Sequence, residues 1–129
     1  MRKLKNESGQ AITEFAVVMP LLFILIFGIV EGGLTLNNYL RLTDAVRVGG
    51  RVASVQGSLG APAATSAATS ALADAAGNLP LQGVDVTATA WQSGQPITVQ
   101  ASTKYSINLP LFGTILSGTL TSSSTQRIE

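Results

Sequence analysis

Cysteine and histidine are both absent from this chain of 129 residues. Without cysteine there is neither a disulfide nor a thiolate metal site, and without histidine the commonest general base and transition-metal ligand are missing. Neither a glycine-rich phosphate loop nor a pair of carboxylates replaces them. We therefore predict no enzyme, no catalytic residue, no metal, no cofactor and no small-molecule substrate. A serine paired with Lys104 is the one catalytic arrangement left open, and a Lys104→Ala variant that keeps its function would exclude it.

Charged and aromatic side chains are also few, at 12% and 5% of the residues. No basic stretch is interleaved with aromatics, so nucleic acid is not an expected partner. The net charge of +1 conceals an uneven distribution, because residues 1–9 carry Arg2, Lys3 and Lys5 against Glu7. We interpret residues 1–9 as a polar leader, whose removal takes away a charge of +2 and turns +1 into −1.

Hydrophobic residues make up 46% of the chain and include one long uncharged run, Phe15–Val30. Extended back through Glu14 to Ala11, the segment has twenty residues, which reach roughly 30 Å as a helix, enough to cross the hydrocarbon core of a bilayer. We predict a transmembrane helix over residues 10–31. Because the bases precede it, the positive-inside rule places the N-terminus in the cytoplasm and residues 32–129 outside, as an extracytoplasmic domain. A secretory signal peptide is the alternative, but Val30-Glu31-Gly32 is a poor cleavage site for one.

Gly9, Gln10 and Glu14 stand where the apolar run begins. A carboxylate at the edge of a membrane segment is unfavourable by about 2–3 kcal/mol and needs a partner. A chain cut after Gly9 would give Gln10 a free ammonium about one helical turn from Glu14, in the same chain or in a neighbouring identical helix. Glycine suits the position before such a cut, because a backbone without a side chain enters a narrow peptidase site. The alternative is an interfacial acid that reaches the headgroups, and cyclisation of Gln10 to pyroglutamate would remove the ammonium.

The N-terminal part of the chain resembles a known family. Its segment GQAITEFAVVMPLLFILIFGIVEGG, followed by TDAVRVGGRVAS, is similar to the N-terminal signature of the TadE-like pseudopilins, in the Tad (Flp) branch of the type IV pilins. The matching positions are Gly9, Ala11, Glu14, Phe15, Ala16, Pro20, Gly28, Glu31, Ala45, Arg47, Gly49 and Arg51. The chain departs from the family pattern directly after Glu31. Members of the family usually carry an aromatic and a glycine there, whereas this chain has Gly32-Gly33.

The resemblance implies a function. A prepilin peptidase would cut between Gly9 and Gln10, and the chain would act as a minor pseudopilin in assembly of a Tad/Flp-type pilus used in adhesion or biofilm formation. It implies a single-pass protein of the bacterial inner membrane, with other pilins or pseudopilins, the pilus assembly machinery and the lipid bilayer as partners. Two alternatives stay open: a major structural pilin, and a membrane-anchored extracytoplasmic binding domain unrelated to pili.

Further residues of this segment are candidates for helix packing. Pro20 lacks an N–H, so the Ala16 carbonyl loses its helical donor and a bend is predicted. Gly28 and Gly32 form a G-x-x-x-G spacing, which permits close helix contact in lipid but is also frequent by chance. The packing candidates are Glu14, Phe15, Pro20, Gly28 and Gly32, and the polar positions of the family signature are Glu31, Arg47 and Arg51. The two arginines belong either to subunit contacts or to a solvated helix face.

The rest of the sequence predicts an α+β fold. The long helix continues to about Val55, and its outer half is amphipathic, with an apolar face of Leu36, Leu40, Val46, Val52 and Val55. Pro62 introduces a short Ala-rich helix over 63–76, which Gly77 ends. Alternating residues predict strands over 84–90, 97–107 and 119–127, with 108–113 as a connecting loop. We expect a three-stranded antiparallel sheet on the outer half of the long helix, in a pilin-like arrangement.

Overall fold

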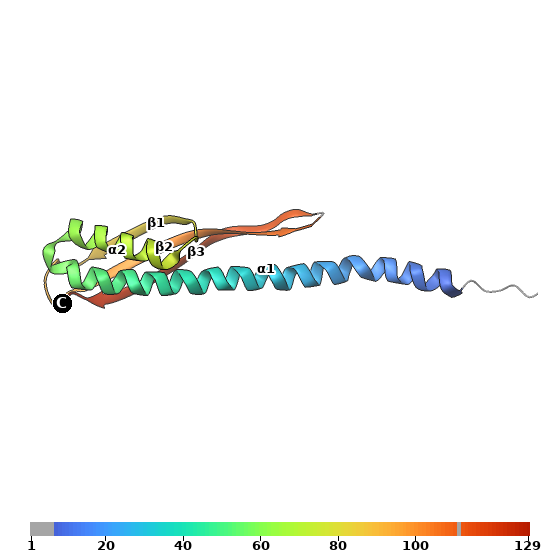
Figure 1. Cartoon of the computed structure of the whole chain (residues 1–129), viewed down its shortest axis with the longest axis horizontal. Coiled ribbons are helices and arrows are strands. Elements are labelled where there is room, and N and C mark those ends of the chain that lie inside the picture. The colour runs from blue at the N-terminus through green and yellow to red at the C-terminus, as the bar shows by residue number, and fades with distance from the viewer. Residues whose placement is uncertain (1–6, 111) are drawn as a thin grey trace, which may run out of the picture.

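The computed structural model describes residues 7–110 and 112–129, which form one long helix with a small α+β head along its C-terminal half (Figure 1). The elements in chain order are helix α1 (Glu7–Gln56), the 3-10 turn η1 (Gly57–Leu59), helix α2 (Ala61–Ala76) and strands β1 (Leu81–Ala88), β2 (Pro96–Leu109) and β3 (Gly113–Arg127). The strands form one antiparallel sheet in the order β1-β2-β3. The predicted fold class, with a second helix and a three-stranded sheet packed on a long apolar helix, is confirmed.

Helix α1 differs slightly from its predicted bounds. It begins at Glu7 and therefore includes the last residues of the predicted leader, while residues 1–6 lie outside the described part of the chain. The helix continues through Pro20 without interruption and ends at Gln56, close to the predicted end (Figure 1).

Small residues pack α1 against α2. The residues of α2 that are buried recur every four positions, which places them on one face of the helix. They are Ala64, Ala68, Leu72 and Ala76. A Cβ atom added to Gly49 of α1 would lie 3.1 Å from the Cβ atom of Leu72 and 3.2 Å from the Ala68 carbonyl oxygen. The missing side chain at Gly49 therefore sets how closely the two helices approach.

The predicted apolar face of the outer half of α1 is largely wrong. Leu36, Leu40 and Val55 are 58%, 55% and 48% exposed. Val46 is buried, as predicted, and Val52 is partly buried. The other buried residues of this part of α1 are Leu42, Ala45, Gly49, Gly50, Ala53 and Ser54. The prediction gave weight to the large residues, whereas α2 and the sheet approach α1 so closely that most of the residues buried beside Leu42 and Val46 are small.

Strand β2 supplies the sheet's contribution to the core. Its alternate residues Ile97, Val99, Ala101 and Thr103 are fully or almost fully buried, as the predicted period of two requires. The buried hydroxyl of Thr103 donates a 2.6 Å hydrogen bond to the Pro80 carbonyl oxygen, so its polarity is satisfied.

Strands β2 and β3 extend further than predicted. Part of the expected loop 108–113 is strand, because β2 runs to Leu109 and β3 begins at Gly113. The Phe112 N–H donates to the Leu109 carbonyl oxygen at 3.2 Å, and Gly113 has a φ of +73°. Pro110 suits the second position of the turn that this hydrogen bond closes, and glycine readily takes the positive φ that follows. A tight hairpin therefore projects beyond the end of β1 and runs alongside α1 (Figure 1).

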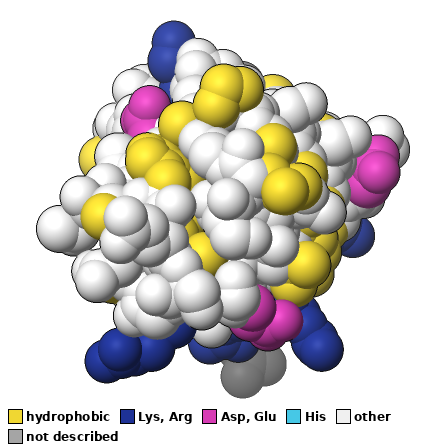
Figure 2. Space-filling model, turned by 90° about the vertical axis from the view of Figure 1, so that its left-hand side faces the viewer, with side chains coloured by type: hydrophobic (Ala, Val, Ile, Leu, Met, Phe, Trp, Pro, Cys, Tyr) yellow, Lys and Arg dark blue, Asp and Glu magenta, His cyan; other side chains and the backbone are white. Residues whose placement is uncertain are grey.

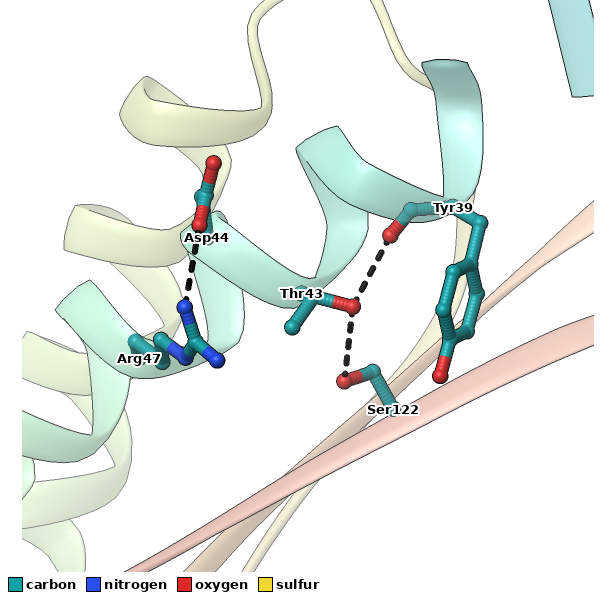
Figure 3. A network of polar contacts seen from close by, with 5 residues as sticks. All are labelled: Tyr39, Thr43, Asp44, Arg47 and Ser122. Carbon is teal, nitrogen blue, oxygen red and sulfur yellow. Dashed lines mark hydrogen bonds and ion pairs between the residues drawn. The ribbon is translucent and has the colours of Figure 1, made fainter. Parts of the chain in front are cut away.

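Polar contacts hold the sheet to α1 at two places. The Thr43 hydroxyl donates to the Tyr39 carbonyl oxygen at 2.9 Å and accepts a 3.4 Å hydrogen bond from the Ser122 hydroxyl of β3 (Figure 3). Near the C-terminus, the Glu129 N–H donates to the Ser54 carbonyl oxygen at 3.0 Å. These contacts fix the direction of β3 along the helix, and with it the direction of the hairpin.

A core substitution tests this packing. Leu72→Ala is expected to lower the free energy of unfolding by about 3 kcal/mol, because a fully buried leucine loses its contacts and leaves a cavity against α1. The measurement is denaturant unfolding of the full chain in detergent, followed by the fluorescence of Trp91, which packs against the core. The matched control is Leu59→Ala, where the side chain is 71% exposed and a change within about 0.5 kcal/mol is expected. Equal effects of the two substitutions would contradict the described core.

Candidate functional site

The N-terminal half of α1 is an apolar helix with little cover from the rest of the chain. None of its most apolar 18-residue window is buried, and the side chains of Val17, Leu21 and Ile29 are 71%, 66% and 67% exposed. A continuous exposed apolar surface of this kind marks a membrane or protein contact. Its length and composition match a single membrane-spanning helix, as the sequence predicts.

The predicted cleavage position and the acid that follows it lie at the free end of this helix. Gly9, Gln10 and Glu14 are all exposed. The Gln10 side-chain amide donates to the Glu14 carboxylate at 3.1 Å, and the Thr13 hydroxyl donates to the Gln10 carbonyl oxygen at 2.7 Å. Gln10 and Glu14 therefore share one face of the helix, one turn apart. Within the uncut chain, the amide already gives the carboxylate a polar partner.

The other packing candidates lie along the same exposed helix. Phe15 is 59% exposed, and Pro20 lies inside α1 and is also exposed. Apart from their chain neighbours and the adjacent backbone of α1, no heavy atom of the described residues lies within 4 Å of the Cβ position at Gly28 or Gly32. No described side chain packs on these two glycines, so another helix can approach them closely.

The three polar positions of the family signature are separated by the structure. Glu31 is half-buried at the start of the head, whereas Arg47 and Arg51 are exposed one turn apart further along α1. Arg47 forms an ion pair with Asp44 at 3.5 Å, with side chains that are 70% and 75% exposed (Figure 3). Exposed pairs of this kind contribute little to stability, about 0–1 kcal/mol.

Arg47 and Arg51 also border a shallow depression between α1 and the end of β3. Its other residues are Ser54, Ser124, Gln126, Arg127, Ile128 and Glu129. Seen from the end of the head furthest from the apolar helix, the surface is mostly uncharged, with scattered apolar side chains and with basic side chains mainly along the lower edge and others at the top and right (Figure 2). No group of three or more His, Cys, Asp or Glu side chains lies close enough to hold a metal ion within residues 7–110 and 112–129.

Sequence reasoning missed the tip of the β2–β3 hairpin. Leu109, Pro110 and Phe112 line an apolar gap of about 470 Å³ together with helix residues between Ala16 and Phe27. The available signal was the apolar composition of the predicted loop 108–113, since connecting loops at a protein surface are usually polar.

The architecture is that of a pilin-like protein: a long N-terminal apolar helix whose second half carries a small head of one helix and a three-stranded antiparallel sheet. Residues 9–51 match the family described as TadE-like protein. Comparison with curated proteins and with solved structures gave no match. The family domain includes every site residue singled out in the sequence, from Gly9 to Arg51. Proteins of this pilin-like family are typically structural and not enzymes.

Proposed function

We propose that this chain is a minor pseudopilin of a Tad/Flp-type pilus, needed for pilus assembly in adhesion or biofilm formation. One observation carries the proposal: the TadE-like domain at residues 9–51 coincides with an exposed apolar helix that has Gly9, Gln10 and Glu14 at its free end. The helix spans the bacterial inner membrane once. The N-terminus faces the cytoplasm, and the head lies outside the membrane.

Cleavage after Gly9 by a prepilin peptidase prepares the chain for assembly. The new N-terminus at Gln10 carries an ammonium, and the Glu14 carboxylate lies one helical turn away. In a bundle of such helices, the ammonium of one subunit pairs with Glu14 of the next. This attraction is strong because the interior of the bundle has a low dielectric constant. An unpaired charge there is strongly unfavourable, so the pair selects one register between neighbouring helices.

Assembly transfers the apolar helix from lipid to protein. The exposed side chains of α1 have apolar surroundings before and after the transfer, so the helix does not enter water at either stage. Gly28 and Gly32 offer an open surface for close helix contact. The exposed Leu36, Leu40 and Val55 continue the apolar surface into the head, beside the exposed Arg47. The partners are other pilins or pseudopilins and the inner-membrane assembly machinery.

Deletion of the gene in the native host tests the proposed function. We expect surface pili to disappear and to return when the wild-type chain is supplied in trans. The ratio of this chain to the most abundant pilin in sheared filaments then separates a minor subunit from a major one, because a major structural pilin would dominate the sheared fraction. Normal piliation in the deletion strain would contradict the proposal and favour a membrane-anchored binding domain.

A further inference from the structure

The tip of the β2–β3 hairpin lies beside the part of α1 that is apolar enough to span a membrane. The gap of about 470 Å³ is bounded on the helix side by Pro20, Phe23 and Phe27 and on the hairpin side by Leu109 and Phe112. Phe27 is the outermost of these helix residues, and it precedes Glu31 by four positions or about 6 Å. If Glu31 marks the outer boundary of the span, the hairpin tip reaches below that boundary.

Large apolar side chains lie near the tip of the hairpin, and an aromatic and a basic side chain lie further back, as expected for a segment that enters a membrane. Phe112, Ile115 and Leu116 near the tip are 62%, 54% and 52% exposed, although all three are large and apolar. Tyr105 and the exposed Lys104 lie four and five residues back from Leu109, or about 13–17 Å along the strand. An aromatic and a lysine at that distance are typical of side chains anchored at the headgroup level.

The polar side chains near the tip are bonded to one another. The Thr114 hydroxyl donates to the Asn108 side-chain oxygen at 2.6 Å, and the Asn108 amide donates to the Ser106 hydroxyl at 3.3 Å. These bonds lower the desolvation penalty of entering an apolar medium. The outer backbone edges of the hairpin are unpaired beyond β1, and lipid does not satisfy such edges. These edges make insertion of the whole sheet unfavourable, so only the part of the hairpin beyond Tyr105 enters the leaflet, with its tip level with Phe23, which precedes Glu31 by eight positions or about 12 Å.

The size of the gap indicates which kind of molecule can fill it. A second α-helix lying along Ala16–Phe27 would be about 18 Å long and at least about 10 Å wide, or roughly 1,400 Å³. The empty space up to the lining atoms is about 940 Å³, which is smaller than that volume, so a helix of a second copy would fit only in part unless the hairpin moved away. Acyl chains need no such opening. From these observations, and resting on the proposed membrane anchor, we infer that the hairpin tip is a second membrane contact, inserted into the outer leaflet beside α1 with lipid chains filling the gap.

Single tryptophan probes test the inference. In a Trp91→Phe background, Phe112→Trp reports on the hairpin tip, Phe23→Trp on the anchor helix and Thr121→Trp on the exposed outer face of the head. The full chain is reconstituted in phosphatidylcholine–phosphatidylglycerol vesicles with acyl chains brominated near the glycerol or near the methyl end, at two protein-to-lipid ratios. We expect Phe112→Trp to have blue-shifted emission that bromines near the methyl end quench most, at both ratios. Thr121→Trp should show water-like emission without quenching.

Each of the other outcomes contradicts a specific part of the proposal. Water-like emission from Phe112→Trp, with Phe23→Trp quenched, overturns the second membrane contact and leaves the anchor intact. Blue-shifted emission that bromine does not quench, and that reverts on dilution into lipid, overturns it in favour of a second copy in the gap. Absence of quenching for Phe23→Trp contradicts the membrane anchor itself and, with it, the proposed function.

Discussion

Replacing Gly9 with valine is expected to abolish processing, so that cells accumulate the uncut chain and lose surface pili. The peptidase must admit the backbone on both sides of the cut, and a β-branched side chain at Gly9 fills space that glycine leaves empty. Intact mass of the membrane-extracted chain measures the result, because loss of residues 1–9 changes the mass by the whole leader.

Ser8→Ala is the matched control for Gly9→Val. It changes the adjacent residue without adding bulk at the cut, so processing and piliation should stay at the wild-type level. Normal cleavage of Gly9→Val would show that this glycine is not the residue before the scissile bond. The proposed cleavage position would then be wrong, even if the chain still assembles.

Glu14→Ala is expected to leave cleavage intact but to reduce pili per cell by at least tenfold. The substitution removes the partner of the Gln10 ammonium in the assembled bundle. A charge left unpaired in such an interior is unfavourable by about 3–5 kcal/mol, which exceeds the 1.4 kcal/mol that corresponds to a factor of about ten. In the membrane the same change removes an unfavourable carboxylate, so the uncut and cut chains should remain in the bilayer. Electron microscopy counts the pili, and intact mass reports the cut.

Thr13→Ala provides the control for Glu14→Ala on the neighbouring residue. The Thr13 hydroxyl contacts only the Gln10 carbonyl oxygen within its own helix, so its loss should not change pili per cell. If Glu14→Ala cells assemble pili as the wild type does, the proposed ion pair does not guide assembly. Loss of cleavage in Glu14→Ala would instead place Glu14 in recognition by the peptidase.

The fold was predictable where one period or one special residue dominates the sequence. Phe15–Val30 required a long apolar helix, the alternation around Val99 required a half-buried strand, and Gly77 ended α2 with a φ of +61°. The packing of the outer half of α1 was not predictable in the same way. Small residues such as Gly49 and Ala53 carry little hydrophobic signal, and their burial depends on how closely α2 and the sheet approach.

The candidate site was also predictable only in part. The residues at the start of α1 were predicted because charge and hydropathy change abruptly there, and the structure places Gln10 and Glu14 on one face of the helix. The hairpin tip was not predicted, because its position beside Phe23 depends on the register of β2 with β3 and on the direction of the sheet along α1. No local pattern around Phe112 contains that long-range information.

The N-terminus of the mature chain tests the central claim most directly. Intact mass and N-terminal peptide mapping of the protein, extracted from the membranes of its native host, should show a chain that begins at Gln10 or at the pyroglutamate formed from it. The pyroglutamate form would agree with cleavage but exclude the Gln10 ammonium as the partner of Glu14. A chain that retains residues 1–9 in a host with an active prepilin peptidase would contradict the pseudopilin function.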